Sequence, residues 1–141
     1  MIKSSKITPK ERGLIKGALR RIFARSDIRQ EVINRGRIEH RDALRPRVTK
    51  WSFCEECGVI TPTYIITVDH VVPVIELHRT MEDMSIDELI DRIWCGIDNL
   101  KGICDSCHTT KTKAENLQRR EFRKARDIAS GKVKTKRKKS K

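Results

Sequence analysis

Aromatic side chains and long apolar runs are scarce in this chain of 141 residues. Aromatic residues make up 4% of it and apolar residues 37%, which is too little for one large hydrophobic core. No stretch approaches the ~20 apolar residues of a membrane span, and the first 30 residues are too charged for the apolar part of a signal peptide. We therefore expect an intracellular protein with no membrane contact, built as one domain with arms or as two small units.

Acidic residues are the minority charge, with 19 Asp and Glu against 32 Lys and Arg and a formal net charge of +13. This excess predicts an anionic partner, with nucleic acid ahead of a membrane surface. The charge is uneven: residues 1–50 hold 15 basic and 5 acidic side chains, residues 51–110 hold 3 and 11, and residues 111–141 hold 14 and 3. The basic arms can bind phosphates. The acidic centre would repel phosphates unless it holds a cation, so its charge is a first indication of a bound metal.

Local signals divide the chain into helical ends and a strand-rich centre. Thr8, Pro9 and Glu11 form a capping box with proline at the first helical position, which predicts the start of a helix. Residues typical of strands surround a tight turn at 54–58. The predicted elements are helices at 9–25, 27–35, 85–94 and from 105 to about 128, strands within 48–68 and at 100–103, irregular chain at 36–46, and a disordered tail at 131–141.

Four of the five cysteines form two Cys-x-x-Cys pairs, Cys54 with Cys57 and Cys104 with Cys107, separated by 46 residues. A disulfide framework is not expected in an intracellular chain. Two such pairs can supply four thiolates to one tetrahedral Zn²⁺, which would add folding free energy to a small core. A redox dithiol at either pair is the alternative. The fifth cysteine, Cys95, is expected to be a buried thiol.

Two further motifs lie between and beside these pairs, Asp69-His70-x-x-Pro73 and Asn99-x4-Cys104-x-x-Cys107-His108-x-x-Lys111. With both cysteine pairs in this order, residues 51–115 resemble the HNH endonuclease family of the zinc-binding type. The stretch from His70 to Asn99 is longer than usual in that family and contains the predicted 85–94 helix. We interpret it as an insert between two strands.

The resemblance implies an α+β fold: a small ββα-metal core, also called a treble clef or His-Me finger, held by a four-cysteine zinc site. We expect a basic helical N-terminal arm at 1–50, the nuclease domain at 51–130 and a basic tail at 131–141. The tail would follow phosphates or serve solubility or localisation.

The chemistry needed is hydrolysis of a phosphodiester by an activated water. His70 is the candidate general base, because an imidazole with a pKa near 6.5 accepts a proton at neutral pH. The resemblance implies that Asp69 and His108 hold one catalytic divalent ion, and an Asp/His site accepts Mg²⁺, Mn²⁺, Ni²⁺, Co²⁺ or Zn²⁺. It also implies that Asn99 fixes the loop and orients the base. Two alternatives stay open: His108 as a zinc ligand, and Asn99 as a simple turn residue.

The predicted partner is DNA, most simply double-stranded, contacted mainly through its phosphates. His78 is a candidate accessory residue of the cleft. The predicted DNA-binding residues are Lys101, Lys111, Arg20, Arg21, Arg45 and Arg47.

The sequence therefore predicts a metal-dependent DNA endonuclease that leaves 5′-phosphate and 3′-hydroxyl ends, as the family does. A small stand-alone HNH protein with basic arms resembles bacteriophage and mobile-element nucleases, which would place it in a bacterial host cell, with other phage proteins as possible partners. The alternatives are a non-catalytic treble-clef zinc module that binds DNA or RNA, and a ribosome-associated zinc protein. Four residues discriminate between the endonuclease and these alternatives, because a binding module does not need them: Asp69, His70, Asn99 and His108.

Overall fold

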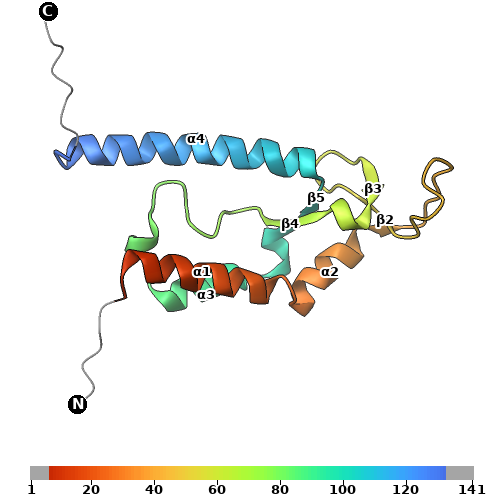
Figure 1. Cartoon of the computed structure of the whole chain (residues 1–141), viewed down its shortest axis with the longest axis horizontal. Coiled ribbons are helices and arrows are strands. Elements are labelled where there is room, and N and C mark those ends of the chain that lie inside the picture. The colour runs from red at the N-terminus through yellow and green to blue at the C-terminus, as the bar shows by residue number, and fades with distance from the viewer. Residues whose placement is uncertain (1–6, 133–141) are drawn as a thin grey trace, which may run out of the picture.

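Four α-helices and five short strands form within residues 7–132, the part of the chain that the computed structural model describes (Figure 1). The two sheets are small, and α1 and α4 run antiparallel along the molecule. In chain order the elements are α1 (Pro9–Phe23), α2 (Asp27–Arg35), β1 (Arg37–Ile38), β2 (Trp51–Phe53), β3 (Ile60–Pro62), β4 (Thr67–His70), α3 (Ile86–Ile93), β5 (Leu100–Ile103) and α4 (Asp105–Ala129). The fold is a mixture of α-helix and antiparallel β-sheet.

The four predicted helices are confirmed, and three of them begin at a side-chain cap. Thr8 accepts a hydrogen bond from the Glu11 N–H, and the Glu11 carboxylate accepts one from the Thr8 N–H in return, which completes the capping box. Ser26 caps α2 and Ser85 caps α3 with a single hydrogen bond each, accepted by the serine side-chain oxygen from a backbone N–H three residues later. The helix expected after Cys104 runs as α4 to Ala129.

The first sheet has the order β1-β2-β3, all antiparallel. The prediction of irregular chain at 36–46 was wrong at its start, because Arg37 pairs with Ser52 in β2. Gly36 allows this pairing: a Cβ there would lie 3.3 Å from the Phe53 carbonyl oxygen. The tight turn after β2 is confirmed, with the Gly58 N–H donating to the Cys54 carbonyl at 2.8 Å and Gly58 at φ +74°.

The second sheet joins β4 to β5 in antiparallel register, with Asp69 opposite Lys101 and His70 opposite Leu100. The connection from 71 to 99 carries α3, and α4 follows β5 directly, with Cys104 at its N-cap. The end of β4 therefore lies beside the start of β5, and α4 passes close enough for Lys111 to reach Asp69.

The main core lies between α1, α2, α3 and β5. Its buried residues are Phe23, Val32, Val74, Met84, Leu89, Ile93 and Leu100. Thus α1 and α2, which the sequence assigns to an N-terminal arm, contribute Phe23 and Val32 to the core that supports β5. A second, smaller cluster consists of Cys54, Ile103 and Cys104, with Cys107 against it.

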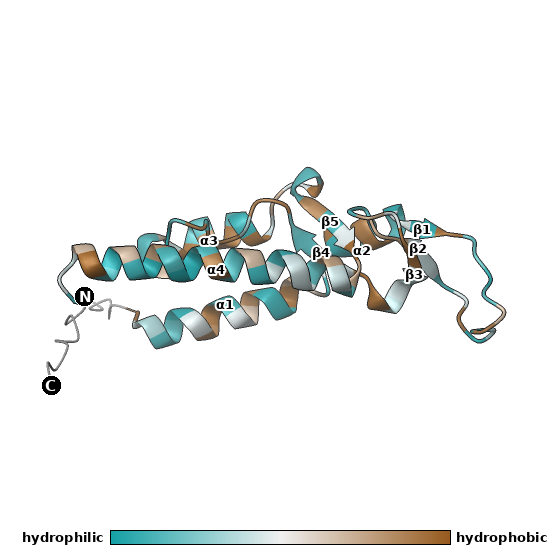
Figure 2. Cartoon of the chain, turned by 90° about the horizontal axis from the view of Figure 1, so that it is seen from above, coloured by the Kyte–Doolittle hydropathy of each residue, from teal (hydrophilic) through white to brown (hydrophobic). Residues whose placement is uncertain are grey.

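Helix α4 differs from the others because none of its residues is buried. Figure 2 shows it largely hydrophilic along its length. Among the described helices, none combines the length and apolarity needed to cross a bilayer. The predicted disordered tail at 131–141 falls almost entirely outside the described residues.

Candidate functional site

The two cysteine pairs come together as the sequence predicts. The sulfur atoms of Cys54, Cys57, Cys104 and Cys107 lie within 4.8 Å of one another, and the Cys57 and Cys104 sulfurs are 3.9 Å apart. A Zn–S bond of ~2.3 Å in a tetrahedron gives sulfur separations of about 3.8 Å. The four thiols are therefore positioned to bind one metal ion such as zinc.

The four sulfurs do not ionise alike. Burial opposes ionisation of Cys54, but backbone N–H groups of Cys104, Cys57 and Glu56 hydrogen-bond its sulfur and lower its pKa to about 6. Hydrogen bonds with Cys57 and Cys104 raise the pKa of Cys107 to about 12. Zinc binds thiolates, so a metal that enters this cluster has to displace the protons of the thiols.

A cavity of about 480 Å³ lies beside this cluster and contains both residues of the Asp-His motif. Asp69 and His70 at the end of β4 line one side, Lys101 of β5 lies nearby, and Cys107 and Lys111 of α4 line the other. Convergent polar groups in a concave site of this size are typical of a ligand or catalytic site.

The side chain of Asp69 points to α4, where its Oδ2 atom lies 2.6 Å from the Lys111 ammonium. The same ammonium donates to the His70 carbonyl oxygen at 2.8 Å and contacts the Glu115 carboxylate at 2.7 Å. Burial alone would lower the pKa of Lys111, but its hydrogen bonds with Asp69 and Glu115 outweigh burial and raise it. Three oxygen atoms therefore surround one permanent positive charge.

His70 points the other way, into the space between α1 and α3. Its Nε2 atom lies 3.1 Å from the Ile93 carbonyl oxygen, and its ring centroid is 5.5 Å from that of Phe23. Because a carbonyl only accepts hydrogen bonds, Nε2 carries the hydrogen and Nδ1 keeps a free lone pair. Burial lowers the pKa of His70, against the raising effects of the Ile93 carbonyl and of Asp69, and so favours the neutral ring.

Asn99 holds the loop that leaves β4. Its Oδ1 accepts a hydrogen bond from the Val72 N–H at 2.7 Å, and its Nδ2 donates to the Val72 carbonyl at 3.3 Å. Its own carbonyl accepts from the Val71 N–H at 2.8 Å. Three hydrogen bonds with Asn99 therefore fix the backbone immediately after His70.

The remaining predicted site residues are less close to the cavity. His108 is half-buried in the first turn of α4 and does not line it. Among the described residues, the four cysteines are the one group of three or more His, Cys, Asp or Glu side chains close enough to share a metal, so Asp69 and His108 belong to no such group. His78 lies against Phe122, with ring centroids 5.8 Å apart, outside the cavity.

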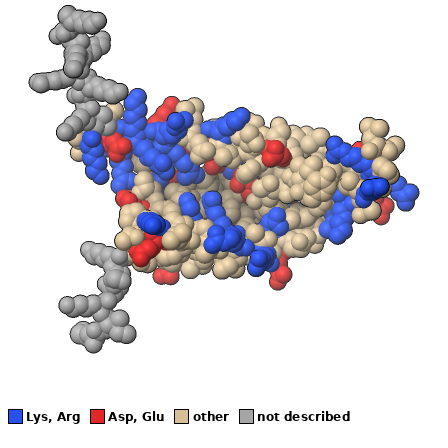
Figure 3. Space-filling view, in the orientation of Figure 1, with Lys and Arg blue, Asp and Glu red and all other residues tan. Residues whose placement is uncertain are grey.

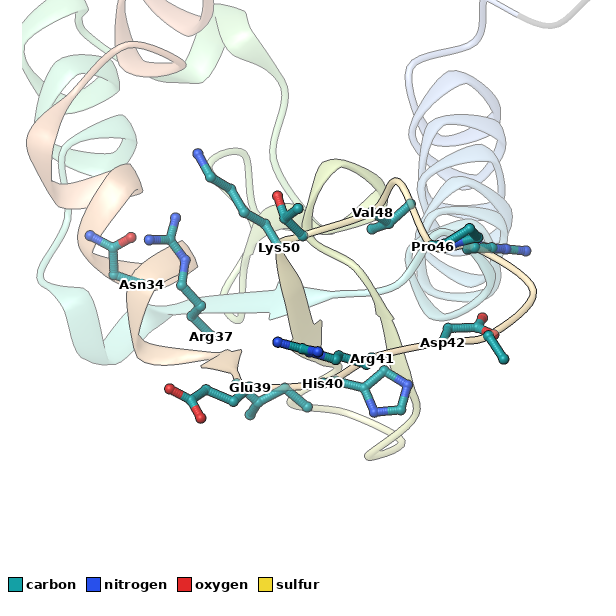
Figure 4. A pocket seen from close by; sticks show the side chains of 13 residues that line it. Asn34, Arg37, Glu39, His40, Arg41, Asp42, Pro46, Val48 and Lys50 are labelled. Atoms are coloured by element: carbon teal, nitrogen blue, oxygen red, sulfur yellow. The ribbon is translucent and has the colours of Figure 1, made fainter.

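The predicted DNA-binding residues occupy three regions. Lys101 pairs with Glu56 at 3.1 Å, and Lys111 is held as described. Arg20 and Arg21 are exposed on the last turn of α1, and Arg20 is near enough to lower the pKa of His70. Arg45 and Arg47 are exposed on the loop from 39 to 50, which surrounds a pocket of about 1400 Å³ (Figure 4).

Two groups that contact the candidate site residues were not anticipated from the sequence. Glu115 follows Lys111 by four residues on α4, a spacing that forms ion pairs on helices and could have signalled it. The Ile93 carbonyl is a backbone group with no sequence signal.

No family model, curated protein or solved structure matches the chain. The resemblance of residues 51–115 to the HNH family therefore rests on the motif residues themselves.

Proposed function

We propose that the protein is a metal-dependent DNA endonuclease of the HNH type, with a structural zinc ion held by Cys54, Cys57, Cys104 and Cys107. The observation that supports this most is that Asp69 and His70, at the end of β4, both line the cavity beside the cysteine cluster. The order of β4, β5 and α4 around the thiols fits a ββα-metal core.

His70 is the general base of the proposed reaction. Its Nε2–H is held by the Ile93 carbonyl, so Nδ1 is the atom that takes a proton from the attacking water. The lowered pKa keeps the ring neutral at pH 7. Asn99 keeps the adjacent backbone in place and acts as a positioning residue. These contacts orient the base before substrate arrives, which removes part of the entropic cost of the reaction.

A divalent ion is the second requirement. Asp69 supplies a carboxylate suited to Mg²⁺ or Mn²⁺, and His108, which precedes Lys111 by three residues on α4, adds an imidazole that transition metals accept. The Asp69, His70 and Glu115 oxygens converge on the Lys111 ammonium, a positively charged group, which supports a cation at this place. Such an ion would act as a Lewis acid at the scissile phosphate and the 3′ oxygen.

One observation favours the alternative, a zinc module that binds nucleic acid without cutting it. Asp69 is neutralised by Lys111, and it shares no metal cluster with His108 in the described structure. On this alternative Lys111 would hold β4 against α4 and contact phosphates, and His70 would serve packing against Phe23.

Relaxation of supercoiled plasmid separates the two functions. The full chain loaded with zinc is assayed with added Mg²⁺, Mn²⁺ or Ni²⁺, alongside His70→Ala and the matched control His78→Ala, which lies outside the cavity. We expect His70→Ala to lose about 10²-fold or more in rate, as general bases contribute about 10²–10⁴-fold, while its zinc content and its fold are retained. Equal cutting by His70→Ala refutes the base, and binding without cutting under every metal supports the alternative.

A further inference from the structure

Four basic side chains on α1 and α4 gather where the fold provides little to neutralise them. Lys16 and Arg20 are one helical turn apart on α1, and Arg119 and Arg123 are one turn apart on α4. Lys16 is half-buried and senses the positive charges of the other three, and together with burial they lower its pKa. Helices α1 and α4 run antiparallel along the molecule (Figure 1), and the charges of Arg119 and Arg123 on α4 reach Lys16 on α1, so the two pairs lie near one another between the helices.

Little acidic charge balances this basic quartet of Lys16, Arg20, Arg119 and Arg123. Within residues 7–132 one of the four has an acidic partner, Arg119, whose Nη2 is 3.5 Å from Glu115 Oε2. Glu115 is itself 2.7 Å from Lys111. Like charges at this helical spacing repel, and partial burial weakens the screening by water. The arrangement is unfavourable for the free protein and favourable with a bound anion.

The contrast with the next turn of α4 is informative. Arg126 pairs with Asp83 at 3.1 Å and donates to the Thr80 hydroxyl, so the fold supplies an acidic partner there. Figure 3 shows Lys and Arg side chains on both sides of the hollow between α4, at the top, and α1, below it. The hollow has walls on both sides, which suits a strand of phosphates better than a flat lipid surface.

The quartet also lies in line with the candidate active site. Arg20 is near enough for its charge to act on His70, and Phe23, at the end of the same helix, lies against the His70 ring. Positions four residues apart on a helix are about 6 Å apart along its axis, a spacing similar to that of successive phosphates on one strand.

We propose that Lys16, Arg20, Arg119 and Arg123 form a phosphate-binding groove that holds one backbone of duplex DNA and leads it to the His70 cavity. This rests on the proposed nucleic-acid substrate, but not on its cleavage. Each residue contacts phosphate and none reads a base, so the groove binds without sequence preference.

Binding of a labelled 30-base-pair duplex, measured at several salt concentrations without added divalent ions, tests the groove. The variant is Lys16→Gln with Arg123→Gln in the full, zinc-loaded chain. The control is Lys10→Gln with Lys113→Gln, which removes the same charge from exposed positions on the same two helices. We expect the slope of log K against log salt to fall by about 1.8 in magnitude for the variant, since each lost phosphate contact contributes about 0.9, and to change little for the control.

Thermal unfolding without DNA excludes a folding defect. Removing the mutual repulsion should raise the melting temperature of the variant at low salt, with the rise lost at high salt. Equal slopes for variant and control, or a lower melting temperature of the variant, overturn the groove. If the variant has the smaller slope but the wild type does not cut DNA, the groove is supported and the proposed nuclease activity is refuted. If the slope is unchanged but DNA cleavage depends on His70, the groove is refuted and the proposed nuclease activity is supported.

Discussion

Removal of one zinc thiolate should unfold the end of the molecule that holds the site. Cys104 is the most informative position, because its sulfur is 3.9 Å from that of Cys57 and its N–H donates to the Cys54 sulfur at 3.2 Å. It is 7% exposed, and the cluster around it consists otherwise of Ile103 and the other ligands. With so few apolar groups, that end has little besides the metal to hold it.

The expected magnitude is large. Structural zinc contributes about 10–16 kcal/mol of apparent binding free energy at pH 7, which is comparable with the 5–15 kcal/mol that typically holds a whole domain folded. A serine at position 104 would add about 1–3 kcal/mol for a buried hydroxyl without a partner. Cys104→Ser should therefore lose stoichiometric zinc and the packing of β4 and β5 on α4. The main core contains no zinc ligand, so α1 and α3 should keep part of their helicity.

Zinc content, circular dichroism and amide hydrogen exchange measure this outcome. The diagnostic amides are those of Glu55 and Cys104, which hydrogen-bond the Gly102 carbonyl and the Cys54 sulfur. Cys95→Ser is the matched control, because Cys95 is half-buried outside the cluster and a serine can still accept from Asn99. A Cys104→Ser protein that holds one zinc per chain and melts with the wild type would refute the reasoning, as would a wild type indifferent to a zinc chelator.

Three further changes test the fold and the site. Leu89→Ala should lower the free energy of unfolding by about 2–5 kcal/mol in urea titration, because Leu89 is 2% exposed in the main core; the same change at the adjacent Ile90, which is 37% exposed, should cost clearly less, and equal costs would contradict the core assignment. Asn99→Ala should reduce cleavage about 10- to 100-fold at unchanged DNA affinity, since it releases Val72 beside the base; full activity would make Asn99 a turn residue. Thr8→Ala should destabilise the protein by about 1 kcal/mol through loss of the α1 cap, and an unchanged thermal melting curve would count against the cap.

Elements with local signals could be predicted from the sequence, and elements defined by distant pairing could not. Thr8, Ser26 and Ser85 each mark a helix start through a bond three residues away, so those helices are confirmed close to the predicted bounds. The pairing of Arg37 with Ser52 depends on β2 returning beside Gly36, and nothing near Arg37 in the sequence indicates it.

The candidate site shows the same division. The cysteine pairs and the adjacent Asp69 and His70 stand out because their spacing is a motif, and the structure brings them to one end of the molecule. The ion pair of Asp69 with Lys111 spans 42 positions, and the bond from His70 to the Ile93 carbonyl spans 23 and involves a backbone atom. Such contacts are set by how β4, α3 and α4 pack, which residue types alone do not specify.

The distribution of charge connects the sequence with the folded structure. The sequence separates an acidic centre from two basic ends, and the folded chain pairs much of that centre with basic side chains. Glu88 holds Arg79 and Arg92, Asp83 holds Arg126, and Glu55 holds Arg35 through two hydrogen bonds. Positive charge is therefore not spread evenly over the described part of the chain. Many of the acidic side chains serve as partners within the fold, whereas among residues 7–132 the quartet of the proposed groove has one acidic partner, Glu115. The proposed groove therefore places positive charge close to His70.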